Sequence, residues 1–361
     1  MPQAFTHRGF LDTRALLFPQ SAAGDSSRVV GEGLLRWEAS YKLNTQLRFS
    51  GAFDARTDSH HHTERRWDIS WQDRSRQRPA FAARRLSAIY NKGRFTAEVG
   101  KQFIRWGKAD IVNPTDRFAP RDFLSVVDND FLGVTAARLT YEGTANTLDL
   151  VWSPRFTPSR IPLLNQRWVA LPEDLPAGFQ LLDAGARFPG GSQFGARFSR
   201  IGRGFEYSLS FYDGFNHLPL FDVTMASFLR PRAGIERRYP QMRMYGADAA
   251  VPLPWFTVKS EAAYFSSSTP QADQYVLYVV QLERMAWLAS GSSWAATPAK
   301  RSPARGTLWI SLPTAVSPAP SSAAPATPST PTATWPGKPR CATTATACGS
   351  SSSTPTPSGS T

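Results

Sequence analysis

Apolar and polar residues alternate along much of the chain up to Arg284, most clearly between positions 34 and 56. The odd positions from 35 to 55 are apolar or small, apart from Thr45. The charged residues of this segment all occupy even positions, namely Arg36, Glu38, Lys42, Arg48, Asp54 and Arg56. Because successive side chains of a strand point to opposite faces, the segment predicts two strands joined at Asn44-Thr45, each with one apolar and one charged face.

The same alternation returns in further pairs of strands joined by short turns. Residues 86–90 and 95–99 flank Asn91-Lys92-Gly93, a turn sequence typical of a hairpin. Other predicted strands lie at 131–142, 147–153, 193–199, 205–211, 242–251, 256–264 and 274–283. The remaining connections are long and cover 57–80, 104–130, 154–191 and 213–240. We count about eleven strands, mostly about 9–13 residues long, which predicts an all-β fold.

The lengths of these strands and of their connections favour a membrane barrel. Soluble sandwich strands typically have five or six residues, whereas a tilted strand that crosses a membrane needs about 9–11. Short turns alternate with long loops, as in outer-membrane barrels. Aromatic residues also lie near strand ends, where a barrel meets the lipid interface: Trp37, Tyr41, Tyr90, Trp152, Trp255 and Tyr264. We therefore predict an antiparallel transmembrane β-barrel, incomplete in this chain, with its apolar face toward lipid.

The charged face of the predicted barrel is expected to line a water-filled lumen. The residues assigned to that face are Arg36, Glu38, Lys42, Arg48, Asp54, Lys259 and Glu261. The alternative is a soluble antiparallel β-protein whose apolar faces form a sandwich core. The density of paired charge on the polar faces favours the lumen.

The C-terminal segment 285–361 differs from the rest of the chain. Most of its positions are Ala, Ser, Thr or Pro, and none is Asp or Glu. One interpretation is a disordered low-complexity tail. The other, which we prefer, is out-of-frame translation, because the shifted frame permits an alternating strand, an Asn/Asp-Gly turn and a return strand. The prediction is therefore a partial barrel over 1–284 followed by a tail over 285–361.

The segment from Gly100 to Phe123 carries a resemblance to a known family. Its motifs are Gly100-Lys101-Gln102, Trp106-Gly107 and Asn113-Pro114-Thr115-Asp116. With these motifs the chain resembles porin-like outer-membrane barrels of Gram-negative bacteria, related in style to alginate-export barrels. The resemblance implies a channel in contact with outer-membrane lipid and lipopolysaccharide. The N-terminal segment 1–20 has no apolar core of a secretory signal, so we expect the signal peptide to be missing from this chain.

Composition excludes several other functions. The net charge is +13, yet the Arg and Lys residues alternate with apolar ones through many strands instead of gathering on one surface, which disfavours nucleic-acid binding. The two cysteines, Cys341 and Cys348, both lie in the tail, so no disulfide framework or cysteine metal site is predicted. We expect no cofactor.

The long connection over 104–130 holds the densest cluster of charge. A loop folded into the lumen narrows a pore, and its charges select among ions. The residues predicted to form the constriction are Arg105, Lys108, Asp110, Asp116, Arg117, Arg121 and Asp122. The alternative is a self-paired salt-bridge network that holds the loop in place.

Sites for catalysis and for metals are not predicted. His60, His61 and His62 are adjacent, and on an extended chain they cannot easily chelate one ion together. No G-x-S-x-G or phosphate-binding G-x-x-x-x-G-K-[ST] motif occurs. His217 with Asp213 and Ser210 only imitates a triad, so we do not expect an enzyme.

The predicted function is passive or selective passage of a small polar solute, with an anion as one candidate. The alternatives are a non-transporting outer-membrane scaffold or adhesin, and a soluble β-protein with a disordered tail. The sequence leaves the oligomeric state open.

Overall fold

The fold was analysed in a computed structural model that describes residues 4–22, 25–109, 112–125, 130–162, 166, 169, 180–227, 232–285 and 305–308. The chain divides into two units, residues 1–318 and 319–361, and the second lies outside the described residues. In the part that the structure describes, no helix is long and apolar enough to cross a membrane.

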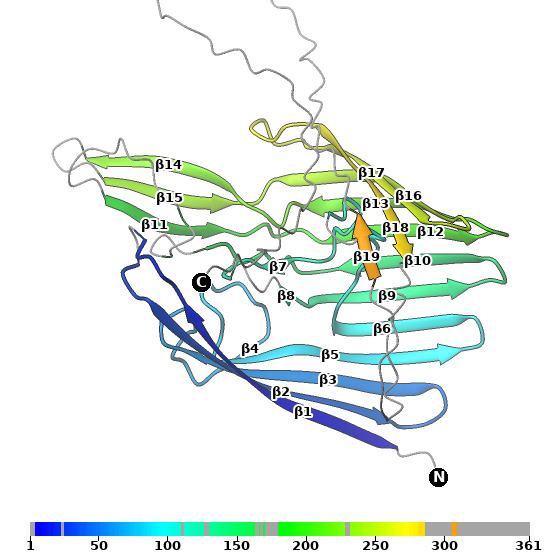
Figure 1. Cartoon of the computed structure of the whole chain (residues 1–361), viewed down its shortest axis with the longest axis horizontal. Helices are drawn as coiled ribbons and strands as arrows, with labels where there is room; N and C mark the ends of the chain where they lie inside the picture. Colours follow the sequence, from blue (N-terminus) through cyan, green and yellow to red (C-terminus); the bar gives the residue numbers. More distant parts are fainter. Residues whose placement is uncertain are drawn as a thin grey trace, which may run out of the picture. The chain divides into compact units, whose positions relative to one another are not determined.

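Most strands belong to one antiparallel sheet (Figure 1). The sheet runs in the order β1-β2-β3-β5-β6-β9-β10-β12-β13-β16-β17-β18-β19, and the two-residue strand β4 pairs with β5 in parallel. The strands are β1 (Phe5–Leu17), β2 (Val29–Lys42), β3 (Leu47–Asp58), β4 (Ile69–Ser70), β5 (Phe81–Lys92), β6 (Phe95–Gln102), β9 (Val134–Glu142), β10 (Asn146–Ser153), β12 (Gln193–Ile201), β13 (Glu206–Phe215), β16 (Gln241–Pro252), β17 (Thr257–Ser266), β18 (Tyr275–Met285) and β19 (Arg305–Leu308). The predicted all-β, antiparallel class is confirmed.

Short and long connections alternate along the sheet, as predicted. The tight turns from β2 to β3, β5 to β6 and β9 to β10 gather at one side (right in Figure 1), and the long connections lie at the other. Two long connections contain structure that the sequence did not predict. They hold β11 (Gln180–Arg187), β14 (Leu220–Ser227) and β15 (Arg232–Arg238), which form a separate three-stranded sheet. The short pair β7 (Arg121–Asp122) and β8 (Asp130–Phe131) lies between β6 and β9 in the chain.

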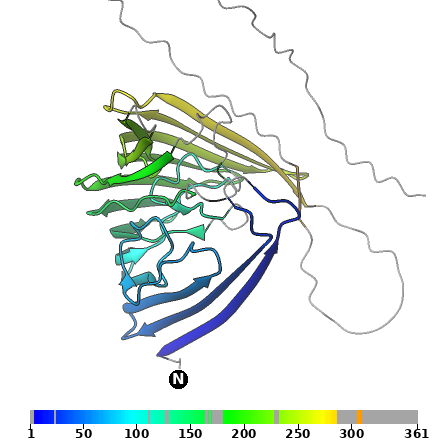
Figure 2. The same ribbon diagram turned by 90° about the vertical axis from the view of Figure 1, so that its left-hand side faces the viewer.

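The two faces of the main sheet differ in chemistry. The register sets Trp37 opposite Phe53 on one face and Arg36 opposite Asp54 on the other. On the outer face, large apolar side chains are exposed on one strand after another: Leu11, Leu35, Trp37, Phe49, Tyr90, Val99, Leu150, Trp152, Phe194, Leu209, Tyr245, Tyr264 and Val280. The sheet is strongly curved, with its first strands (blue) and last strands (yellow) slanting toward each other (Figure 2).

The hydrophobic core lies on the inner face, under the connection between β6 and β9. Ile104, Trp106 and Phe118 of that connection pack on inward-facing apolar side chains of the sheet: Val134, Ala136, Val151, Tyr212, Met242, Met244, Ala263 and Phe265. A buried apolar cluster therefore covers part of the face whose charged residues are predicted to line a wet lumen. Burial of one such side chain is worth about 1.5–3 kcal/mol, so the connection is held firmly.

Four residues of the predicted tail form β19, which pairs with β18. The rest of the tail, 286–304 and 309–361, lies outside the described residues. The assignment of 285–361 as a tail and its out-of-frame origin stay predictions.

Candidate functional site

The candidate site is built by the connection between β6 and β9, residues 103–133, here called the inner loop. Glu261 of β17 holds this loop against the inner face. One carboxylate oxygen accepts hydrogen bonds from the Thr115 backbone N–H and hydroxyl at 2.7 and 2.8 Å. The other accepts from the backbone N–H groups of Lys108 and Ala109 at 3.1 and 3.3 Å. Glu261 is only 2% exposed, so these bonds replace nearly all of its water.

A second carboxylate shapes the loop from within. Asp116 accepts hydrogen bonds from the backbone N–H groups of Trp106 and Gly107, which closes the segment 106–116 on itself. The indole N–H of Trp106 then donates to Asp149 on β10 at 2.9 Å. Arg138 on β9 also binds Asp149, at 2.7 Å. Asp116, the last residue of the Asn-Pro-Thr-Asp motif, is thus hydrogen-bonded to both residues of the Trp-Gly motif.

Two glycines on the sheet make room for the loop. A Cβ atom at Gly195 of β12 would lie 2.5 Å from Phe118 and 2.6 Å from Trp106. A Cβ atom at Gly246 of β16 would lie 2.7 Å from Thr115. Both glycines lie on the inner face, where any side chain would push the loop away.

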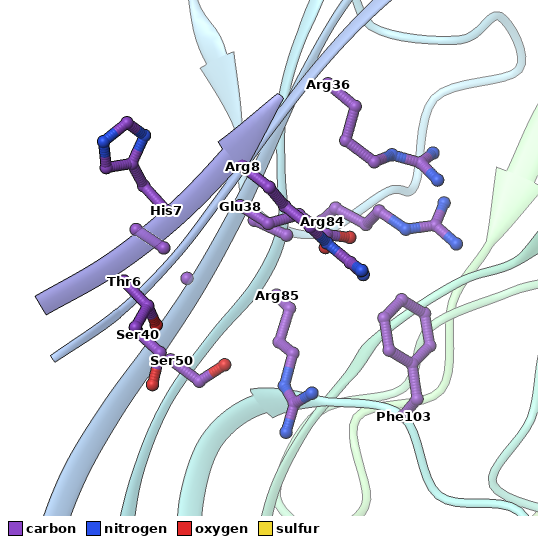
Figure 3. Close-up of a pocket in the computed structure, with 13 residues that line it drawn as sticks. Thr6, His7, Arg8, Arg36, Glu38, Ser40, Ser50, Arg84, Arg85 and Phe103 are labelled. Carbon is purple, nitrogen blue, oxygen red and sulfur yellow. The ribbon is translucent and has the colours of Figure 1, made fainter. Parts of the chain in front are cut away.

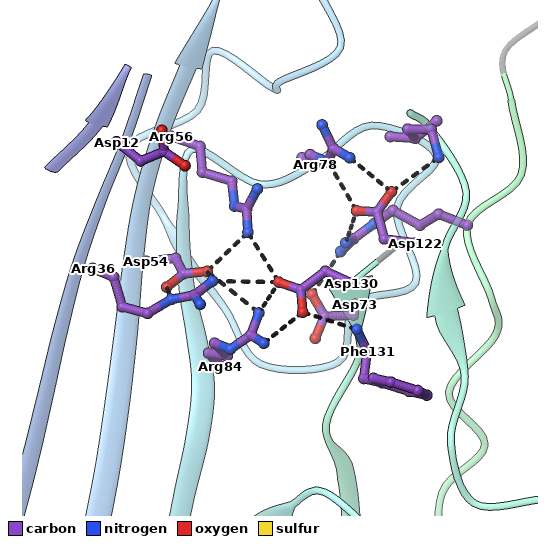
Figure 4. A network of polar contacts seen from close by, with 12 residues as sticks. Asp12, Arg36, Asp54, Arg56, Asp73, Arg78, Arg84, Asp122, Asp130 and Phe131 are labelled. Atoms are coloured by element: carbon purple, nitrogen blue, oxygen red, sulfur yellow. Dashed lines mark hydrogen bonds and ion pairs between the residues drawn. The ribbon is translucent and has the colours of Figure 1, made fainter. Parts of the chain in front are cut away.

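An ionic network links the loop to the first strands (Figure 4). Arg36 of β2 binds Asp54 of β3 at 2.7 and 2.8 Å. Arg84 of β5 binds Asp130 of the inner loop, and Arg56 lies 3.1 Å from Asp54 and 3.6 Å from Asp130. Three guanidiniums therefore share two carboxylates, which leaves a local excess of positive charge.

Buried ion pairs extend this network and join the inner loop to the β3–β5 and β10–β12 connections. Arg78 and Arg160 both bind Asp122, at 2.9 and 3.1 Å. Arg160 also binds Asp73 at 2.6 Å, and Asp73 pairs with Lys101. Burial raises the pKa of the Asp122 carboxyl, but the adjacent Arg78 and Arg160 outweigh it, so the pKa lies below its ordinary value. A desolvated network of this kind is costly to break, because each lost partner leaves a buried charge.

A polar cavity of about 410 Å³ lies on the inner face of β1 to β5 (Figure 3). Arg8, Arg36, Arg84 and Arg85 line it together with Phe103 of the inner loop, and the Arg84 guanidinium lies over the Phe103 ring at 5.0 Å. Arg84 and Arg85 line the cavity together because the register between β3 and β5 shifts at this point. Such a bulge adds one residue and redirects side chains. Simple alternation would have sent one of the two arginines to the outer face.

The predicted constriction residues divide into anchored and open groups. Asp116 and Asp122 are buried and bonded within the loop and its network. Lys108 is paired with Glu206 at 2.9 Å and with Asp248 at 3.3 Å. The open group is Arg105, Arg117 and Arg121. Asp110 lies outside the described residues.

The predicted lumen residues lie on the inner face. The pairs Arg36–Asp54 and Lys259–Glu283 join neighbouring strands, and Glu38 pairs with Arg8 of β1 at 2.5 Å. Lys42 and Arg48 are register partners at exposed strand ends next to a tight turn. Glu261 is different, because the inner loop covers nearly all of its side chain.

The histidines do not assemble a catalytic or metal site in the part of the chain described. The His60 and His62 rings lie 5.9 Å apart, and the described residues include no group of three or more His, Cys, Asp or Glu side chains that could hold a metal ion. His217 is buried, with Nδ1 2.6 Å from the Thr157 carbonyl oxygen and Nε2 2.6 Å from the Arg117 carbonyl oxygen. It connects three loops and stacks on Phe156.

His217 predicts a pH dependence of loop stability. Burial lowers its pKa from 6.5 to about 4, although the two carbonyl oxygens raise it. The folded protein therefore holds the His217 ring neutral. The contribution of the neutral ring to the free energy of unfolding is complete above pH 6.5 and is lost as the pH falls toward 4. The loss should reach about 3 kcal/mol, at about 1.4 kcal/mol per pKa unit.

Hydrogen exchange of residues 154–160 between pH 7 and pH 4 measures this effect, after correction for intrinsic rates. The His217→Gln variant should lack the added destabilisation. Stabilisation on acidification would contradict the prediction and would mean that a protonated ring bridges both carbonyls.

Several residues of the site escaped the sequence reasoning. Asp149 and Asp248 lie on the inner face at positions that alternate with outward-facing apolar residues, so strand parity was a usable signal. Asp73 and Arg160 lie in long connections, where no periodicity indicates a partner.

The chain was compared with known proteins. No family model and no curated protein matches it. Among solved structures it is similar to the outer-membrane protein OmpT of Vibrio cholerae, with 8% identity, a TM-score of 0.32, and 80% of this chain and 86% of that chain covered. It is also similar to a mutant porin of Rhodopseudomonas blastica, with 10% identity, a TM-score of 0.28, and 78% and 89% covered. For OmpF of Salmonella typhi in complex with daunomycin, the identity is 9%, the TM-score 0.31, and the coverage 80% and 82%.

Proposed function

We propose that this chain forms the wall and constriction of a porin-like channel in an outer membrane. The observation that carries the proposal is the position of the inner loop. It is bonded through Glu261 to a charged inner face, while the opposite face of the same sheet exposes Trp37, Leu150 and other large apolar side chains. A soluble sandwich buries its apolar faces against each other, whereas a membrane barrel turns them toward lipid.

The strand lengths fit this environment. The long strands of the main sheet have 8–14 residues, close to the about 9–11 needed to cross a bilayer at a tilt. Exposed aromatic residues such as Trp152, Tyr41 and Trp255 would anchor the barrel at the lipid interfaces. The apolar outer face would then contact membrane lipid and lipopolysaccharide.

The proposed mechanism is diffusion of a small polar solute past the inner loop. No covalent step and no cofactor is involved. The surplus of guanidinium groups around Asp54 and Asp130 favours the passage of anions. In a narrow pore, dissolved salt screens such charges only weakly, so they attract a passing anion strongly.

Single-channel recording of the refolded full chain in planar bilayers tests the proposal. We expect discrete conductance steps with a preference for chloride over potassium. A second candidate, a non-conducting scaffold, is favoured by the dry cluster under the loop, where Trp106 and Phe118 occupy part of the lumen. A bilayer that stays sealed after insertion would reject the channel and support the scaffold.

A further inference from the structure

Three arginines of the inner loop carry more charge than the described carboxylates balance. Arg105 is 3.6 Å from Asp116 through its Nε atom. Over the described residues, no other carboxylate lies within 4.0 Å of Arg105, Arg117 or Arg121. Asp116 accepts two backbone hydrogen bonds through Oδ1, and its Oδ2 atom, which faces Arg105, is buried without a hydrogen-bond partner among the described residues. Among the described residues, the cluster thus has a surplus of two positive charges, three guanidiniums against the Asp116 carboxylate.

Aromatic rings hold these guanidiniums in place without using up their hydrogen-bond donors. The Cζ atoms of Arg105 and Arg121 lie 4.3 and 4.4 Å from the centroid of the Phe131 ring. Arg117 lies over the Phe265 ring at 5.1 Å. A cation–π contact uses the face of a guanidinium and leaves the N–H groups at its edge available. Because Arg105 and Arg121 contact the same ring, their Cζ atoms lie at most 8.7 Å apart, the sum of 4.3 and 4.4 Å.

The other contacts of the cluster are long. Arg117 donates to the Asn113 carbonyl oxygen at 3.4 Å, and Arg121 donates to the Asn113 side-chain oxygen at 3.5 Å. The Nε atom of Arg117 is buried without a partner among the described residues. Burial lowers the pKa of Arg121, Asp116 raises it, and the neighbouring Arg105 and Arg117 lower it again. Arg121 is therefore repelled by the positive charges of both Arg105 and Arg117.

We propose that Arg105, Arg117 and Arg121 bind a small dianion through its carboxylate or phosphate oxygens. The proposal rests on the channel function above and names the class of solute that the constriction selects. A dianion matches the surplus of two charges, and the fixed guanidinium edges suit bidentate contact with oxygen pairs. The Arg105 side chain is 49% exposed, so a solute reaches the cluster from the lumen.

Calorimetry on the detergent-solubilised full chain at pH 8 tests the site, with succinate, inorganic phosphate and acetate as probes. We expect succinate or phosphate to bind at least tenfold more tightly than acetate. Arg105→Lys and Arg121→Lys keep the charge but lose the planar fork, and each should weaken binding at least fivefold. Arg187→Gln removes an exposed charge on β11, and it should leave binding unchanged.

The outcomes separate this site from the channel. Equal binding by wild type and both lysine variants would overturn the proposal, because a diffuse field would then explain the affinity. Absence of dianion binding in a chain that conducts would also overturn it and leave the channel intact. Binding by a chain that does not conduct would support the site and reject the channel. A preference for succinate over phosphate, or the reverse, supports the site and identifies which oxygen chemistry it takes.

Discussion

The Glu261→Ala variant is expected to release the inner loop from β17 and to raise the single-channel conductance of the proposed channel. Four hydrogen bonds from the loop end on this carboxylate, and two come from Thr115 alone. Hydrogen bonds to a charged group are each worth about 1.5–3 kcal/mol, but they do not add fully. We expect a loss of about 4 kcal/mol in the free energy of unfolding, measured by urea titration.

A matched control comes from the same face and the same loop. Glu206 also contacts the loop, through Lys108 at 2.9 Å, but its side chain is 39% exposed. Exposed pairs contribute about 0–1 kcal/mol, so Glu206→Ala should change both readouts little. If Glu261→Ala and Glu206→Ala behave alike, the loop is not held by the buried carboxylate, and the proposed constriction loses its anchor.

Strand parity assigns side chains to the two faces of the sheet. Arg36 and Asp54 were assigned to the same face from their even positions, and the register places them opposite each other. The same rule places Lys259 and Glu261 inward on β17. Parity works here because the alternation is fixed by the pleat of the backbone, which tertiary contacts do not alter.

Parity does not reveal what covers a face. Met244 and Phe265 point inward, and nothing in their own strands indicates that Trp106 and Phe118 pack on them. The bulge at Arg84 breaks the rule locally, because one added residue changes the side-chain direction. Such contacts depend on segments far apart in the sequence.

The charged loop shows the same limit. The cluster of charge in 104–130 was found from composition. Composition did not show which of these charged residues are paired with carboxylates and which are not. Lys108 and Arg105 have similar sequence surroundings, yet Lys108 meets two wall carboxylates and Arg105 meets the ring of Phe131. The partner of a long side chain depends on how the loop folds, which periodicity does not encode.

The Gly195→Val variant is expected to displace the inner loop by steric conflict alone. The Cβ atom would lie 2.5 Å from the Phe118 ring and 2.6 Å from the Trp106 ring, closer than packed carbon atoms approach. Both rings are nearly fully buried, so neither moves aside easily. Overpacking typically costs about 1–3 kcal/mol, and conflict with two aromatic rings puts this variant at about 3 kcal/mol. Urea unfolding measures the cost, and conductance reports the position of the loop.

Two comparisons make this prediction specific to the contact. Ala196→Val adds bulk to the next residue of β12, on the outer face beside Leu150 and Phe211, and should leave stability and conductance nearly unchanged. Phe118→Ala in the Gly195→Val background removes one conflicting ring, so the two changes together should cost less than the sum of the separate ones. Additive losses would mean that the ring and the glycine do not touch. The inner loop would then lie away from β12. The proposal that this loop, held against the sheet, forms the constriction of the channel would be wrong.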